Sequence, residues 1–147
     1  MGRENQSRRG ILFLCVANSA RSQIAEALAR RMAPPGTEVY SAGSSPGRLH
    51  PLAVRVLAEK GIDASGQYSK PIDAIPRERI GTVITLCAEE VCPVFPGEVE
   101  RLHWPFEDPA AAGPDEEQAL EAFRRVRDAI AARLHEYFAD WRGSDSN

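Results

Sequence analysis

The spacing of hydrophobic positions predicts alternating strands and helices. Residues 11–14 (Ile-Leu-Phe-Leu) are wholly apolar, as in a strand that is buried on both faces of a parallel sheet. From Ser22 to Met32 apolar residues recur every three or four positions, which predicts a helix that Pro34-Pro35-Gly36 ends. A buried strand, a tight loop and a helix therefore open the fold.

The rest of the chain repeats this alternation. Segments 38–42, 82–86 and 101–104 predict further strands, and segment 51–60 predicts a helix that Gly61 ends. A final helix is expected to begin near Pro114-Asp115-Glu116 and to cover one sheet face. This order predicts an α/β fold with a doubly wound parallel sheet, in which ligands bind beyond the carboxyl ends of the strands.

Length and composition favour one domain. A chain of 147 residues with 43% hydrophobic content can bury one core, and we expect a single catalytic domain over 11–141 with flexible tails at 1–10 and 142–147. The 18 basic and 21 acidic residues are scattered, which argues against nucleic-acid binding. No apolar segment is long enough to span a membrane, and the polar start lacks the apolar stretch of a secretory signal, so a cytoplasmic protein is expected.

The strongest chemical signal is the loop between the first predicted strand and helix. It begins at Cys15 and follows the pattern C-x5-R-S. Its anion-binding positions are expected to be Val16, Ala17, Asn18, Ser19, Ala20, Arg21 and Ser22. A loop that enters a helix amino terminus points backbone N–H groups at one spot, and that arrangement binds tetrahedral oxyanions.

The side chains of this loop suit the same chemistry. Arg21 offers a planar fork of donors to two oxygens of one anion, and the positive field that binds the anion also stabilises a thiolate at Cys15. Ser22 is placed to donate a hydrogen bond to that thiolate, and Asn18 tolerates the left-handed backbone that a tight loop needs. The alternative is that Cys15 is only a small buried hydrophobic residue at a strand end.

Two further cysteines, Cys87 and Cys92, lie together after the third predicted strand. A zinc site is disfavoured because no second cysteine pair exists and only His50, His103 and His135 remain as partners. Four intervening residues allow a loop to close a disulfide, so a redox pair is the better interpretation. Two unrelated buried thiols are the alternative.

The segment ILFLCVANSARSQIAEAL resembles the signature of the low-molecular-weight tyrosine phosphatase superfamily, and specifically its arsenate reductase branch. The similarity continues through residues 40–43, both later cysteines and residues 104–109, and so covers nearly the whole domain. It implies a four-stranded parallel sheet flanked by helices, a cytoplasmic role in arsenical resistance, and a monomeric enzyme without a bound cofactor or metal.

The resemblance also implies a mechanism. The Cys15 thiolate attacks arsenate, Asp108 protonates the departing hydroxide, Cys87 attacks Cys15 to release arsenite, and Cys92 attacks Cys87. Thioredoxin is the implied reductant of the resulting redox-active disulfide, and phosphate and sulfate are the implied analogues of arsenate. Glutaredoxin or a low-molecular-weight thiol stays an alternative, because the gap between Cys87 and Cys92 is shorter than in many relatives. Ala20 stands where those relatives often carry a further cysteine.

The acid is assigned less directly than the nucleophile. Asp108 lies in Trp104-Pro105-Phe106-Glu107-Asp108-Pro109 and is similar in context to the general acid of the family, with Glu107 as its rival. On residue type alone, an Asp-Pro pair is more often part of a turn than a catalytic acid.

Some of these reductases bind potassium beside the loop through Asn, Glu, Ser and Asp side chains. Asn18, Glu26 and Ser41 match three of these, and Lys70 stands in place of the fourth. We hypothesise that the Lys70 ammonium occupies or repels the ion site, holds Asn18 and Glu26, and makes activity independent of potassium. The alternative is a solvated surface lysine.

Two rival functions use the same loop. A tyrosine phosphatase usually has aromatic residues after its Asp-Pro pair, whereas Asp108-Pro109 is followed by three alanines and Gly113, which argues against an aryl substrate. Weak phosphatase activity is still expected, because phosphate and arsenate have nearly the same shape. A non-catalytic oxyanion or redox sensor is the second rival.

Overall fold

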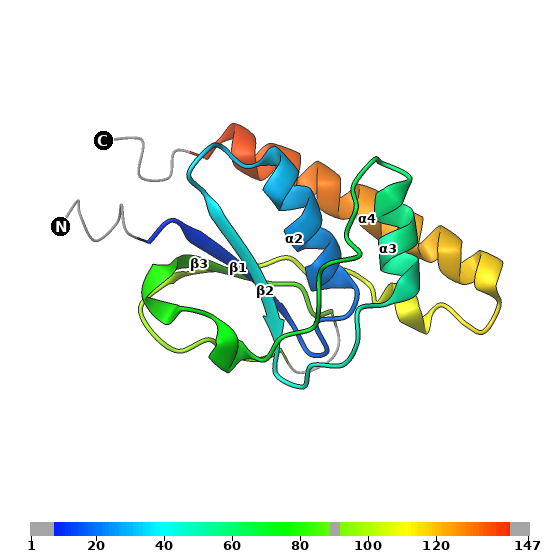
Figure 1. Cartoon of the computed structure of the whole chain (residues 1–147), viewed down its shortest axis with the longest axis horizontal. Helices are drawn as coiled ribbons and strands as arrows, with labels where there is room; N and C mark the ends of the chain where they lie inside the picture. The colour runs from blue at the N-terminus through cyan, green and yellow to red at the C-terminus, as the bar shows by residue number, and fades with distance from the viewer. Residues whose placement is uncertain (1–7, 89–91, 142–147) are drawn as a thin grey trace.

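The computed structural model describes residues 8–88 and 92–141 and has one four-stranded sheet (Figure 1). Its strands are β1 (Gly10–Cys15), β2 (Glu38–Gly43), β3 (Ile80–Thr85) and β4 (Glu100–His103). All pairings are parallel and the order is β2-β1-β3-β4, so the chain winds outward from β1 in both directions. The predicted fold class is confirmed.

Within the described residues, three α-helices accompany the sheet. They are α2 (Arg21–Met32), α3 (Pro51–Ala58) and α4 (Glu116–Ala139), and three short 3-10 helices lie at Ile72–Ala74 (η1), Arg77–Arg79 (η2) and Pro109–Ala111 (η3). The predicted elements all occur, with boundaries that differ by up to two residues. The helix expected over 51–60 ends at Ala58, because the chain turns through Gly61, whose φ is 77°. The expected tail 1–10 overlaps β1 at Gly10, while residues 1–7 and 142–147 lie outside the described residues.

The two faces of the sheet are covered differently. On one face, Ile11 and Phe13 of β1 pack in a cluster with all three α-helices, including Ile24 of α2 and Phe123 of α4. This agrees with the expectation that the last helix covers a sheet face. Its amino terminus is capped by the side chain of Asp115, which accepts a hydrogen bond from the backbone of Glu117.

On the opposite face, Leu12 and Leu14 pack against Ile75 and Phe95, which belong to connecting segments rather than to α-helices. The crossover from α3 to β3 runs along this face through η1 and η2, seen in green in Figure 1. Within the described parts of the chain, no helix is long and apolar enough to cross a membrane.

Candidate active site

The predicted oxyanion loop joins the carboxyl end of β1 to the amino terminus of α2. Cys15 is a buried free thiol whose Sγ lies 2.9 Å from Ser22 Oγ. Ala20 occupies the N-cap of α2 and offers no side-chain acceptor. Because an alanine cannot cap the helix, the first N–H groups of α2 are left to bind an anion. The local chain thus brings a nucleophile, a hydroxyl and a helix terminus together.

Asn18 is the residue that holds this loop to its surroundings. Its φ of 51° is the left-handed conformation that asparagine tolerates. Its Nδ2 donates to Ser22 Oγ at 2.7 Å and to Ser41 Oγ at 3.0 Å, so β2 supports the same hydroxyl that contacts the Cys15 thiol. Both hydrogen bonds are buried, and within a buried network they should be well ordered.

A glycine at the end of β2 allows this close approach. A Cβ added to Gly43 would lie 2.4 Å from the carbonyl oxygen of Val16 and 2.9 Å from the backbone nitrogen of Asn18. Those distances are too short for any side chain, so the loop can only lie against β2 because residue 43 is glycine.

A buried charge network lies behind the loop. Ser41 donates a short hydrogen bond to Oε1 of Glu26, whose side chain is 3% exposed. The carboxylate of Glu26 also pairs with Arg30 at 2.8 Å and with the Lys70 ammonium at 3.6 Å. Burial lowers the pKa of Lys70, and the negative charge of Glu26 opposes that shift.

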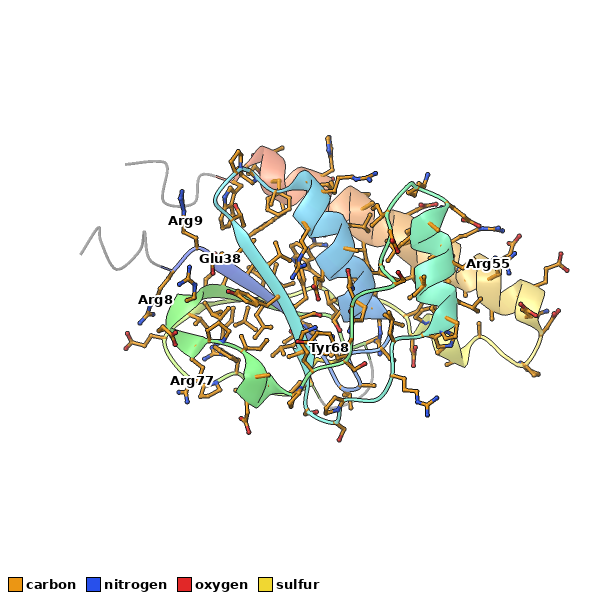
Figure 2. The ribbon with its side chains drawn as sticks, in the orientation of Figure 1. Arg8, Arg9, Glu38, Arg55, Tyr68 and Arg77 are labelled. Atoms are coloured by element: carbon orange, nitrogen blue, oxygen red, sulfur yellow. A yellow bond between two sulfur atoms is a disulfide. The ribbon has the colours of Figure 1, made fainter. Side chains whose placement is uncertain are left out.

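Lys70 contacts the loop support in two further ways. Its backbone N–H donates to Asn18 Oδ1 at 2.9 Å, and its ammonium donates to the carbonyl of Tyr68 at 2.8 Å. The expected contact with Asn18 therefore comes from the Lys70 backbone, while the ammonium contacts Glu26. The Lys70 carbonyl accepts from Gly43 at the carboxyl end of β2. Figure 2 shows Tyr68 near the same end of this strand.

The structure separates the two candidate acids. Asp108 Oδ2 lies 4.0 Å from Nη2 of Arg21, and Oδ1 caps η3 by accepting from the backbone of Ala110. Glu107 instead forms an ion pair with Arg125 of α4 at 2.8 Å, which lowers the pKa of Glu107. Only Asp108 lines the hollow that contains Cys15.

Arg21 links the loop to the segment that carries Asp108. Its Nη1 donates to the carbonyl of Phe106 at 3.0 Å and to that of Leu86 at 3.4 Å. These hydrogen bonds hold the guanidinium against the segments that follow β3 and β4. A planar group held in this way is suited to bidentate contact with an oxyanion.

The hollow above the loop has a volume of about 290 Å³. It is lined by Cys15, Val16, Ala17, Ser19, Ala20, Arg21, Asp108 and Ala110. The side chains around the polar groups are small, and none of these lining residues is aromatic. Such a site fits a small tetrahedral anion better than an extended aryl ester.

His50 lies near the acid without lining this hollow. It caps α3 by accepting from the Leu52 backbone, and its ring packs against Phe123 at 4.6 Å. Burial lowers the pKa of His50, and the charge of Asp108 opposes the shift. His50 connects the oxyanion loop to α3 and α4, since its backbone N–H also donates to the carbonyl of Ser19 at 2.9 Å.

The two later cysteines form a disulfide at the end of the strand next to β1. Cys87 and Cys92 have Cα atoms 5.7 Å apart, and Cys87 is 1% exposed. The backbone of Leu86 donates to Leu14 at 3.0 Å, so Cys87 follows directly on a residue bonded to the neighbour of Cys15. Cys15 and Cys87 thus lie at adjacent strand ends, and the disulfide holds Cys92 beside Cys87. Residues 89–91 between the pair lie outside the described residues.

Sequence reasoning missed several residues that hold the loop. Gln23 Nε2 donates to the carbonyl of Asn18 at 2.9 Å and to that of Tyr68 at 2.9 Å, and Ser69 Oγ donates to the same Asn18 carbonyl at 2.7 Å. Gln23 is completely buried although it lies off the apolar stripe of α2. A polar residue directly after the C-x5-R-S pattern was the only available signal. The described residues hold no cluster of three or more His, Cys, Asp or Glu side chains suited to a metal ion.

Comparison with known proteins defines the class to which this fold and site belong. The low-molecular-weight phosphotyrosine protein phosphatase family matches residues 10–144, and the chain belongs to that family.

Particular relatives are more specific. An arsenate reductase of Bacillus subtilis is 45% identical over 129 residues, which cover 86% of this chain and 93% of the relative. The structure of an arsenate reductase in the phosphate binding state has a TM-score of 0.75 at 34% identity, covering 88% of this chain and 96% of that one. A thioredoxin-dependent arsenate reductase of Corynebacterium glutamicum has a TM-score of 0.66 at 30% identity, covering 94% of this chain and 68% of that one.

Proposed function

We propose that this protein is an arsenate reductase that uses Cys15, Cys87 and Cys92 in turn. The observation that carries the proposal is a free Cys15 thiol in an oxyanion loop, beside a Cys87–Cys92 disulfide on the neighbouring strand end. A phosphatase needs the first of these features and has no use for the second. The similarity to arsenate reductases over most of the chain supports the same conclusion.

The first step forms an arsenic–sulfur bond. The Cys15 thiolate attacks arsenate held by the loop N–H groups and Arg21, and one hydroxyl group of arsenate takes a proton from Asp108 and departs as water. The contact between Asp108 and Arg21 at 4.0 Å supports this role, because both would face the same bound anion. Ser22, whose Oγ lies 2.9 Å from the sulfur, would stabilise the thiolate before attack and again on release.

The second step reduces arsenic. The Cys87 thiolate attacks Cys15 Sγ, and the electron pair of the arsenic–sulfur bond goes to arsenic, which leaves as arsenite. The two cysteines lose those two electrons and become a disulfide. Cys92 then attacks Cys87, and Cys15 departs as a thiolate. The disulfide seen in the structure corresponds to the end of this sequence.

An external dithiol closes the cycle. Cys87 is buried, whereas Cys92 is partly exposed and lines a groove, so an incoming thiolate would reach Cys92 first. Thioredoxin is the proposed reductant, with glutaredoxin or a low-molecular-weight thiol as the alternative, and no bound cofactor or metal takes part. We further propose that the enzyme is monomeric. We also propose that it is cytoplasmic, because a reducing compartment keeps the three thiols ready for reaction.

A coupled assay tests the proposed activity. With thioredoxin, thioredoxin reductase and NADPH, arsenate should drive NADPH oxidation, while hydrolysis of p-nitrophenyl phosphate should be much slower than arsenate reduction. Replacing thioredoxin by glutaredoxin and glutathione identifies the reductant. Rapid aryl phosphate hydrolysis without any arsenate-dependent NADPH oxidation would instead establish the phosphatase.

Lys70 is proposed to be the counter-ion that keeps Glu26 and the loop in place without a bound potassium ion. Its ammonium lies 3.6 Å from the buried carboxylate, and the Ser41, Asn18 and Ser22 side chains connect that carboxylate to Cys15. A lysine whose side chain is 12% exposed and bonded to Tyr68 does not behave as a solvated surface residue.

Removing this ammonium should impair turnover and create a need for potassium. In Lys70→Gln we expect kcat/KM for arsenate to fall about 10- to 100-fold, because small displacements of a catalytic group are costly. Potassium should restore part of the loss, whereas the wild-type rate should not change when sodium is exchanged for potassium at constant ionic strength. Lys60→Gln, at an exposed position, is the matched control. Potassium activation of the wild type would contradict the assignment.

A further inference from the structure

A histidine and a threonine are paired at the carboxyl end of the sheet, outside the oxyanion loop. Thr85 is the last residue of β3, His103 is the last residue of β4, and the two are partners in the parallel register. Thr85 Oγ1 lies 2.7 Å from His103 Nδ1. The pairing of the two strand ends therefore places the imidazole ring, and the hydroxyl fixes its orientation.

The two contacts of the Thr85 hydroxyl favour one tautomer of His103. The Thr85 hydroxyl donates its hydrogen to the carbonyl of Leu102 at 3.3 Å. Both contacts are hydrogen bonds only when the hydroxyl accepts from His103, which puts the proton of the neutral ring on Nδ1 and leaves the lone pair on Nε2. An imidazole oriented by a hydrogen bond at one nitrogen is prepared to accept a proton at the other.

His103 and Cys92 line the same groove, which has a volume of about 280 Å³. The groove lies between β4 and the segment after Cys92, and its lining is otherwise mainly apolar. Its lining residues are Val83, Thr85, Cys92, Pro93, Val94, Phe95, Arg101, Leu102 and His103. The charged and titratable side chains among them are Cys92, His103 and Arg101, and Arg101 donates to the carbonyl of Gly97 at 2.7 Å.

We propose that His103 is the general base of the last thiol exchange within the protein. This inference rests on the proposed relay. Nε2 of His103 takes the proton of the Cys92 thiol, the resulting thiolate attacks Cys87 Sγ, and the Cys15–Cys87 bond breaks to release the Cys15 thiolate. The products are the Cys87–Cys92 disulfide and a protonated His103. When the external dithiol later releases Cys92, the imidazolium returns the proton.

The size of the effect follows from ordinary thiol chemistry. A cysteine with a pKa of about 8.5 is only about 3% ionised at pH 7, so a fully effective base raises the thiolate population by at most about 30-fold. Because a more acidic thiol is also a weaker nucleophile, the expected gain in rate at pH 7 is about 10-fold. This gain should vanish at alkaline pH, where Cys92 ionises without help.

A single-turnover experiment with His103→Gln measures this step. Reduced protein is mixed with arsenate, quenched by alkylation, and the Cys15–Cys87 and Cys87–Cys92 bridges are quantified by peptide mass spectrometry. We expect Cys15–Cys87 to form at the wild-type rate and its conversion to Cys87–Cys92 to slow about 10-fold at pH 7 and hardly at all near pH 9. Thr85→Val, which removes the orienting hydroxyl, should show a smaller defect with the same pH dependence. His135→Gln, at an exposed position of α4 outside the groove, is the matched control.

Equal conversion rates in His103→Gln and the wild type would overturn the proposal, and so would a defect that persists unchanged near pH 9, because a purely structural role is not relieved by base. A second measurement is independent of arsenate. In a Cys15→Ser, Cys87→Ser background, Cys92 is the remaining thiol, and His103→Gln should slow its alkylation by iodoacetamide at pH 7. Failure of arsenate to oxidise the wild type would refute the proposed relay alone, and the alkylation rates would still decide the role of His103.

Discussion

Replacing Cys15 by serine should lower arsenate reduction by at least about 10⁴-fold, the scale of loss when a catalytic nucleophile is removed. A serine hydroxyl can keep the contact with Ser22, but it forms neither the arsenic–sulfur bond nor the disulfide that follows. The measurement is arsenate-dependent NADPH oxidation in the thioredoxin-coupled assay.

Anion binding provides the control for this variant. Because the loop N–H groups and Arg21 are unchanged, Cys15→Ser should still be stabilised by phosphate or sulfate in a thermal unfolding experiment. Retention of more than a small fraction of the wild-type rate would mean that another thiol attacks arsenate, and the assignment of Cys15 would then be wrong.

Replacing Asp108 by asparagine should lower kcat/KM for arsenate by about 10²- to 10⁴-fold, the range for loss of a general acid. Asparagine keeps the cap of η3 through its side-chain oxygen, so the loop geometry should persist while the transferable proton is lost. The coupled assay measures the effect.

Glu107→Gln is the matched control for the acid. It removes one exposed ion pair with Arg125, which is worth about 0 to 1 kcal/mol, and the rate should stay within about twofold of the wild type. If Glu107→Gln were the damaging substitution and Asp108→Asn harmless, the roles of the two carboxylates would have to be exchanged.

Much of the fold could be predicted because hydrophobic spacing reports burial directly. The wholly apolar run in β1 has 0% exposure from Ile11 to Leu14, as expected for a strand with both faces covered. The covering of one face could not be predicted. Ile75 and Phe95 lie in irregular segments, where no periodic pattern shows which apolar residues face the sheet.

In the candidate site, too, the features that are local in sequence could be predicted and the contacts between distant segments could not. The loop from Cys15 to Ser22 is continuous in sequence, so its pattern alone indicated an oxyanion site. The support from Gln23 and Ser69, the close approach at Gly43 and the bond from Lys70 to Asn18 are contacts between distant segments. Such contacts depend on how the strands pair, and no local pattern contains them.

Only the three-dimensional structure distinguishes the two candidate acids and the two later cysteines from each other. Glu107 and Asp108 are adjacent in sequence, and only the position of Arg125 on α4 directs Glu107 away from the hollow. In the same way, the burial of Cys87 and the partial exposure of Cys92 distinguish the internal from the external end of the relay. In the sequence, His103 stands out only as a possible partner for a metal ion, whereas the register of β4 places it beside Thr85.

Trapping the disulfide relay at its intermediate stage tests the proposed mechanism most directly. Reduced wild-type protein and Cys92→Ser are incubated with arsenate, free thiols are alkylated, and disulfides are mapped by peptide mass spectrometry. We expect an arsenate-dependent Cys87–Cys92 bridge in the wild type and a Cys15–Cys87 bridge in Cys92→Ser. If all three thiols of the wild type stay free after exposure to arsenate, the reductase mechanism is contradicted.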